Sequence, residues 1–294
     1  MSKLSQALES GAFVVTAELA PPKGVDVSKP LRAAERLKPY VTAMNVTDQQ
    51  ASVMRLAPLG LCRVLKEQGV EPIMQMTCRD RNRVALQADM LAGAVLGIEN
   101  ILCMTGDPSS MGDHPDAKPV FDVDVTTLVR MAATLQKGRD LAGHPLEGAP
   151  SFTIGAVANP GATPLEPEVV KLEKKVEVGA TFIQTQGVFD VKEFERFRLL
   201  TKGIKVKVLA GIILLKSGNM ARWMNKNIPG VKVTDRIIVE IDAAPDKEKA
   251  CVEIASRTIR DLRSLCDGVH IMALGWEEHI PAVLKAAGAL QPAT

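Results

Sequence analysis

Short apolar segments rich in β-branched residues recur along the chain, separated by segments whose apolar residues have helical spacing. The short segments predict eight strands, at residues 13–19, 41–47, 71–77, 100–106, 151–157, 181–186, 207–214 and 268–274. The intervening helical patterns cover residues 29–40, 55–69, 80–97, 124–138, 167–180 and 248–266. Strands and helices that alternate in this way predict an α/β fold of the closed (β/α)8 TIM barrel type.

One barrel domain over residues 1–294 accounts for the whole chain. A length of 294 residues with 46% hydrophobic content is enough to bury one large core, and no change of composition divides it. Residues 143–151 read as a loop before the fifth strand. The alternative is a doubly wound dinucleotide-binding sheet, but the first strand continues into residues 19–26 without the G-x-G-x-x-G turn that such a fold needs.

Charge and composition exclude several classes of partner. The 36 basic and 34 acidic residues leave a net charge of +2, and no run of like charges predicts binding to nucleic acid or a membrane surface. No segment approaches the roughly 18 apolar residues of a membrane span, and no signal peptide is apparent, so we expect a cytoplasmic protein. Five scattered cysteines and four distant histidines lack metal-ligand spacing, so we expect neither a disulfide framework nor a metal.

Polar residues follow nearly every predicted strand. The carboxyl ends of the strands of a TIM barrel converge on one open face, so these side chains should line a polar site for a small molecule. They are Glu18, Asn45, Thr47, Asp48, Gln75, Thr77, Thr105, Asp107, Asn159, Gln184, Gln186, Lys216 and Ser217.

Glu18 and Asp107 are the candidates for catalysis. Glu18 ends an otherwise apolar strand, where partial desolvation would favour its neutral form and let it act as a general acid. Pro21 and Pro22 then stiffen the loop that carries it. Asp107 follows the turn residue Gly106 and precedes a proline, which restricts its backbone to extended geometry. An ion pair with a neighbouring barrel residue is the structural alternative for Glu18.

Five segments together resemble the methylenetetrahydrofolate reductases. These enzymes are flavin-dependent TIM barrels that reduce 5,10-methylenetetrahydrofolate to 5-methyltetrahydrofolate. The segments are TAELAPPKG, MTCRDRN, MTGDPSS, LEKKVEVGATFIQTQGVFD and AGIILLKSGN, and the similarity extends from about residue 12 to residue 290.

The resemblance implies roles for individual residues. Glu18 would protonate N10 of the folate as its ring opens to a 5-iminium cation, and the negative charge of Asp107 would stabilise that cation. Gln186 would bind the pterin, and Met220 lies near a position where many members of the family have phenylalanine. The residues expected to contact the flavin, which would supply the hydride, are Thr47, Gln75, Thr77, Thr105, Gly106, Asp107 and Lys175.

Two aromatic positions of the family pattern are Gly187 and Val188 in this chain. A nicotinamide ring would therefore find less surface for stacking, which puts direct reduction by NAD(P)H in doubt. The resemblance is to short reductases that work beside a zinc- or iron–sulfur-containing partner subunit, so a partner is an alternative source of electrons. The flavin could be FAD or FMN, and we expect an oligomer.

Other interpretations remain open from the sequence. Lys216, if desolvated, could form a Schiff base in a lyase built on the same barrel. The chain could also be a non-catalytic folate- or flavin-binding subunit of a complex. Arg79, Arg81 and Arg83 read either as the solvated start of a helix or as binding groups for the flavin phosphate or the folate tail.

Overall fold

Eight parallel strands close into a barrel in residues 1–228 and 230–290, which the computed structural model describes. Each strand pairs with the next in sequence, and β8 pairs with β1, so the predicted TIM barrel is confirmed. The strands are β1 (Val14–Leu19), β2 (Ala43–Val46), β3 (Pro72–Thr77), β4 (Asn100–Met104), β5 (Thr153–Ala158), β6 (Phe182–Gly187), β7 (Lys207–Ile213) and β8 (Gly268–Met272).

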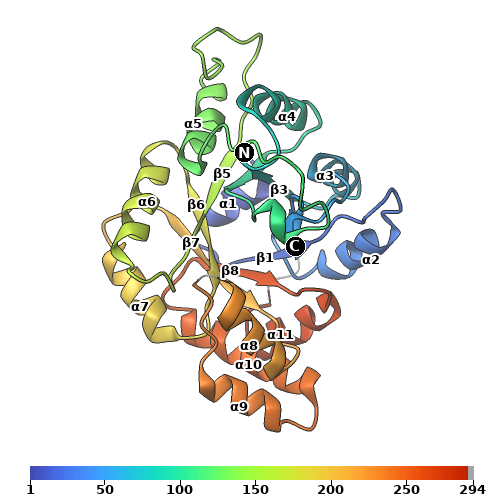
Figure 1. The fold of residues 1–294 in the computed structure, drawn as a ribbon, viewed down its shortest axis with the longest axis vertical. Coiled ribbons are helices and arrows are strands. Elements are labelled where there is room, and N and C mark those ends of the chain that lie inside the picture. Colours follow the sequence, from blue (N-terminus) through green and yellow to red (C-terminus); the bar gives the residue numbers. More distant parts are fainter. Residues whose placement is uncertain (229, 291–294) are drawn as a thin grey trace.

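Helices surround the barrel (Figure 1). They are α1 (Lys3–Glu9), α2 (Ser28–Leu37), α3 (Pro58–Glu67), α4 (Arg83–Val95), α5 (Val125–Leu135), α6 (Glu166–Glu177), α7 (Val191–Leu200), α8 (Gly218–Asn227), α9 (Asp235–Ala243), α10 (Lys247–Leu262) and α11 (Ile280–Ala286). Short 3-10 helices are η1 (Gln50–Ser52), η2 (Ser109–Met111) and η3 (Glu277–His279). None of the helices in the described residues is long and apolar enough to cross a membrane.

Local signals explain where several helices begin. Asn82 precedes α4 and accepts hydrogen bonds from the backbone N–H groups of Val84 and Ala85, which satisfies two donors that the helix itself leaves unpaired. Asp124 caps α5 in the same way through the N–H of Thr127. The chain departs from strict alternation after β7, where α8, α9 and α10 follow one another before β8. Figure 1 shows α9 on the outer side of this group, far from the strands.

Apolar side chains fill the amino end of the barrel. Helix α1 contributes Leu4 and Leu8, which are buried against strand residues that point inward, namely Val14, Ala43, Ile73, Leu102, Phe182 and Leu209. The Phe182 ring occupies space beside Gly155, where an added Cβ would lie 2.3 Å from the ring. The polar layers described below therefore lie toward the carboxyl ends of the strands.

The five cysteines are free thiols held in apolar surroundings. Four are buried and Cys266 is half-buried. Burial raises the pKa of all five, to about 12 for Cys78 and Cys251 and about 11 for Cys266. Because the thiolate is the reactive form, we expect iodoacetamide to leave the native protein unlabelled and to label five residues after denaturation, as read by mass spectrometry. Rapid labelling of the native protein would contradict this.

Candidate active site

A layer of hydrogen-bonded polar side chains lies inside the barrel above the apolar layer. Asn45 and Gln184 exchange two amide hydrogen bonds, of 2.7 and 3.0 Å. Gln184 Nε2 also donates to Thr16 Oγ1 at 3.2 Å, and that hydroxyl lies 2.9 Å from Nδ1 of His270. All four side chains are buried. These four residues connect β2, β6, β1 and β8 across the barrel.

Glu18 lies directly above this layer. It is two residues beyond Thr16 on β1 and therefore on the same face of the strand. Its side chain is 16% exposed, its Oε1 accepts a hydrogen bond of 3.2 Å from Nε2 of Gln75, and the same oxygen lies 3.6 Å from Nε2 of His270. Glu18 thus combines polar neighbours from β3 and β8 with limited access to solvent. The sequence left open an ion pair between Glu18 and a neighbouring barrel residue. His270 is such a neighbour, and it would be a cation only if protonated.

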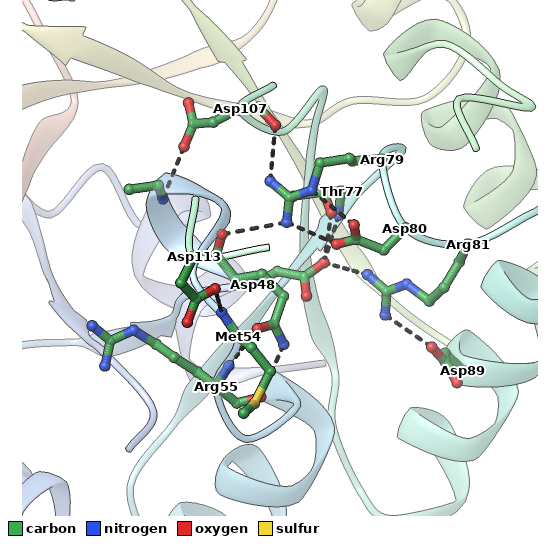
Figure 2. Close-up of polar contacts among 12 residues, drawn as sticks. Asp48, Met54, Arg55, Thr77, Arg79, Asp80, Arg81, Asp89, Asp107 and Asp113 are labelled. Carbon is green, nitrogen blue, oxygen red and sulfur yellow. Dashed lines mark hydrogen bonds and ion pairs between the residues drawn. The ribbon is translucent and has the colours of Figure 1, made fainter. Parts of the chain in front are cut away.

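Asp107 lies in the loop after β4 and is exposed. The turn before it depends on Gly106, which has a φ of +92° and lies so close to Thr77 that an added Cβ would be 3.0 Å from the Cβ of Thr77. The Asp107 carboxylate accepts a 3.0 Å hydrogen bond from the backbone N–H of Ala51, in the loop after β2. Its carbonyl oxygen accepts a 3.0 Å bond from the guanidinium of Arg79 (Figure 2).

A buried ionic cluster fixes the ends of β2 and β3. Asp48 Oδ2 accepts hydrogen bonds from the backbone N–H and the hydroxyl of Thr77, at 2.8 and 3.0 Å, and forms an ion pair with Arg81. Arg81 also donates to Asp89 at 2.9 Å, as Figure 2 shows. Burial raises the pKa of the Asp48 carboxyl above its ordinary value, and the Arg81 charge opposes that change.

The three arginines after β3 have different surroundings. Arg79 is almost fully buried, pairs with Asp80, and donates to the carbonyl oxygens of Asp107 and Gln49. Arg81 is the partner of Asp48, and Arg83 is an exposed partner of Asp122 on the surface. The solvated-helix interpretation therefore describes Arg83, whereas Arg79 and Arg81 hold loops in place.

A second contact joins the loops that follow β1, β2 and β4. Asp113 forms an ion pair with Lys23 and accepts a 3.0 Å hydrogen bond from the N–H of Met54 (Figure 2 shows the latter). Gly112 lies against the backbone of Ser52, where an added Cβ would be 1.8 Å from the carbonyl oxygen. The loop that carries Asp107 is thereby held against the loops that follow β1 and β2.

Replacing Gly112 by alanine should disrupt this contact. The backbone of Gly112 has a φ of −95°, which alanine adopts readily, so the effect would come from the clash with Ser52 alone. We expect the free energy of unfolding to fall by about 1–3 kcal/mol, measured by urea denaturation. Gly203→Ala is the matched control, because no atom lies within 4 Å of the added Cβ. Equal stability of the two variants would contradict the close approach.

Lys175 lies on α6 and is buried. Its Nζ donates a 2.7 Å hydrogen bond to the carbonyl oxygen of Val157, near the end of β5, and lies 4.0 Å from the Glu168 carboxylate. Burial lowers the pKa of the Lys175 ammonium, and the negative charge of Glu168 opposes the change. The side chain thus reaches the carboxyl end of the barrel from the helix.

The remaining predicted site residues are distributed around the same end of the barrel. Thr47 follows β2, and its Oγ1 is buried without a hydrogen-bond partner among the described residues. Thr105 is exposed, Gln186 is half-buried with its Oε1 bonded to the N–H of Gly187, and Met220 lies in the first turn of α8. No group of three or more potential metal ligands occurs in the described part of the chain.

Lys216 follows β7 and contacts an aromatic ring. Its Nζ lies 5.3 Å from the centre of the Trp276 ring, in a cation–π contact. Trp276 also contacts His279 edge-on, with ring centres 5.0 Å apart. Trp276 therefore packs against side chains of this chain.

His270 lies beside the site, although the sequence alone placed it only among four distant histidines without metal-ligand spacing. It is buried and hydrogen-bonded, and its second ring nitrogen faces Glu18. The sequence could have indicated His270, because it is a polar residue in the middle of the apolar segment 268–272. Alternate positions of a barrel strand point inward, so a polar residue there can face the barrel interior.

Comparisons with known proteins agree over most of the chain. The family model described as methylenetetrahydrofolate reductase matches residues 3–288. The chain is 26% identical to a 5,10-methylenetetrahydrofolate reductase of Pectobacterium carotovorum subsp. carotovorum, over 69% of this chain and 64% of that protein. It is 23% identical to methylenetetrahydrofolate reductase 1 of Schizosaccharomyces pombe, over 75% of this chain and 36% of that protein. The chain thus spans less than two thirds of the length of these relatives.

A solved structure shares the fold. It is an uncharacterized protein from Clostridium thermocellum that binds two copies of 5-methyl-5,6,7,8-tetrahydrofolic acid. The TM-score is 0.62 at 12% sequence identity, and the match covers 97% of both chains. At this level of identity the similarity establishes the common barrel architecture.

Proposed function

Because the chain belongs to the methylenetetrahydrofolate reductase family, we propose that it reduces 5,10-methylenetetrahydrofolate to 5-methyltetrahydrofolate with a bound flavin. The observation that carries the proposal is the convergence of Glu18 and Asp107 on the carboxyl end of one barrel, where TIM-barrel enzymes place their chemistry. The ion pair between Lys23 and Asp113 joins the loops that follow these two residues. Two carboxyl groups are thus available to the same open end.

The residues at this end fit a flavin. Thr47 has a buried hydroxyl without a partner in the described residues, which a ligand hydroxyl or carbonyl could satisfy. Gly106 lacks a side chain where the turn after β4 approaches β3, and Lys175 brings an ammonium group to the end of β5. We therefore assign Thr47, Thr77, Thr105, Gly106 and Lys175 to the cofactor. When bound, the flavin would supply the reducing equivalents.

The protein groups would act on the folate. Glu18 would donate a proton to N10 as the ring opens. The carboxylate of Asp107 would stabilise the cation that forms at N5. Gln186 and Met220 would contact the pterin from β6 and α8. Gln75, predicted as a cofactor ligand, donates to Glu18 and is better assigned to orienting it.

Electrons would reach the flavin through a partner subunit. Gly187 provides no ring and Val188 is a buried aliphatic residue, so neither offers nicotinamide an aromatic surface.

The five free thiols suit a cytoplasmic enzyme, where cysteines stay reduced.

The test begins with purified protein reconstituted with FAD and, separately, with FMN. We expect one flavin to bind and to raise the midpoint of thermal unfolding, and we expect NADH alone to bleach it slowly. Failure to bind either flavin would refute the flavin-dependent proposal, whereas rapid bleaching by NADH would refute only the requirement for a partner.

A further inference from the structure

We propose that Lys216 binds a carboxylate of the glutamate tail of the folate, and that Trp276 holds the lysine ammonium group in place. This inference deepens the proposed function and rests on it, because it takes the substrate to be a folate. It concerns the two loops that follow β7 and β8, where the ammonium group lies beside the indole ring at the open end of the barrel.

Lys216 differs from other cations at this end of the barrel, because no described residue pairs with its charge. Three of those cations form ion pairs with aspartates, namely Lys23, Arg79 and Arg81. Lys216 is half-buried and makes neither a hydrogen bond nor an ion pair within the described part of the chain. An ammonium group has three N–H donors, so this one can accept an anion that another molecule supplies.

The turn after β8 fixes the ring beside this ammonium group. Leu274 has a φ of +52° and Gly275 a φ of +89°, and the first of these is uncommon for a bulky side chain. The backbone N–H of Trp276 donates to the carbonyl oxygen of Ala273 at 3.1 Å, and its ring contacts a histidine ring edge-on. The indole is thus held by its own backbone and by a neighbouring ring, so it gives the cation a defined position.

The place of Lys216 in the barrel indicates which ligand brings the anion. Strand β8 pairs with both β1 and β7, so the ends of these three strands are neighbours. Glu18 lies on β1, Lys216 lies three residues after β7, and Trp276 lies four residues after β8. The residues assigned to the folate come from β1, β6 and α8, which border this position, whereas those assigned to the flavin come from the segments between β2 and α6. The anion therefore belongs to the folate.

The chemistry of a folate supplies such an anion. Its p-aminobenzoyl-glutamate tail carries two carboxylates, and a charge-assisted hydrogen bond from Lys216 to one of them contributes to affinity. The carboxylates are remote from the atoms that react, so this bond is equally strong before and during the reaction. It therefore strengthens binding without changing the rate of the chemical step, and it favours folates that retain glutamate.

Two substitutions and two ligands test the contact. Lys216→Met removes the charge and keeps an unbranched side chain, whereas Lys216→Arg keeps the charge. Isothermal titration calorimetry of flavin-reconstituted protein compares 5-methyltetrahydrofolate with 5-methyltetrahydropteroate, which lacks the glutamate. We expect Lys216→Met to weaken binding of 5-methyltetrahydrofolate by about 10-fold and Lys216→Arg to restore most of it. The pteroate compound should bind the unmodified protein and Lys216→Met equally well.

Lys137→Met is the matched control for the loss of one positive charge. Lys137 is exposed and follows α5, in the connection to the amino end of β5, so its replacement should not change the affinity for either ligand. In stopped-flow reoxidation of prereduced flavin by methylenetetrahydrofolate, Lys216→Met should raise the half-saturating concentration and leave the limiting rate unchanged. A lower limiting rate at an unchanged half-saturating concentration would overturn the proposal.

The remaining outcomes are distinct. Unchanged affinity of Lys216→Met for 5-methyltetrahydrofolate would overturn the proposal, and so would an equal loss for both ligands, which indicates a structural role. A loss of flavin affinity instead would assign the ammonium group to the flavin phosphate and would also overturn it. If Lys216→Met does not fold, the unmodified protein still decides, because equal affinity for the two ligands refutes a contact with the tail. If the unmodified protein binds neither ligand, the proposed function itself fails.

Discussion

Replacing Glu18 by glutamine is expected to slow flavin reoxidation by methylenetetrahydrofolate by about 10²–10⁴-fold, because a positioned general acid contributes an effect of this size. Glutamine matches the shape of the carboxyl group and can still contact Gln75 and His270, but it cannot donate an acidic proton to N10. Flavin affinity should be unchanged, since Glu18 is assigned to the folate. Stopped-flow measurement of the two half-reactions separates these effects.

Glu71→Gln is the matched control. Glu71 is also a buried carboxylate of the barrel, but it precedes β3 at the amino end, where it accepts a hydrogen bond from Asn100. Its replacement should leave the rate of reoxidation close to that of the unmodified protein. If Glu18→Gln is reoxidised as fast as the unmodified protein, the chain does not use Glu18 as an acid.

The second large effect is expected from Arg81→Met, which removes the charged partner of Asp48. Asp48 is buried and would be left without its counter-ion, although its hydrogen bonds from Thr77 remain. Breaking a buried ion pair on one side costs about 3–5 kcal/mol, and urea denaturation should show a loss of this order. Asp89→Asn removes the more exposed partner of Arg81 and should cost about 1 kcal/mol or less.

The loss caused by Arg81→Met should depend on pH. Burial raises the pKa of Asp48 in the folded protein above the value of about 3.9 for an unfolded aspartate, so ionisation of Asp48 opposes folding as the pH rises. Arg81 counteracts this effect, and its removal raises the folded-state pKa further. The stability difference between variant and unmodified protein should therefore be larger at about pH 8 than at about pH 5. A difference that grows toward acid pH would contradict the assignment of Arg81 to Asp48.

The sequence predicted the strands well for a physical reason. Parallel barrel strands are buried by helices on one side and by the barrel interior on the other, so each appears as a short apolar segment. Each of the eight predicted segments overlaps one observed strand, and β5 and β6 extend one residue beyond the predicted end. The predicted loop at residues 143–151 has no helix or strand. Helices α1, α7, α8, α9 and α11 were not predicted individually. α1 is only seven residues long, and α9 adds to the expected alternation between β7 and β8.

The site was predictable only in part. Glu18 and Asp107 could be placed because strand ends are visible in the sequence and converge in any TIM barrel. The family resemblance then suggested their roles, and the match to the methylenetetrahydrofolate reductase family model confirms that resemblance. The pairing of Asp48 with Arg81 and the hydrogen-bonded layer that includes Asn45 and His270 could not be predicted, because they depend on which side chains meet across the barrel. That information lies in strand register and not in local pattern.

Anaerobic single turnover tests the central claim most directly. Reconstituted protein is reduced chemically, mixed with one equivalent of 5,10-methylenetetrahydrofolate, and followed by visible absorbance while the folate products are separated by chromatography. The account predicts that the flavin is reoxidised and that 5-methyltetrahydrofolate forms in equal amount. Reduced flavin that persists beside unchanged methylenetetrahydrofolate, in protein shown to bind both, would contradict it.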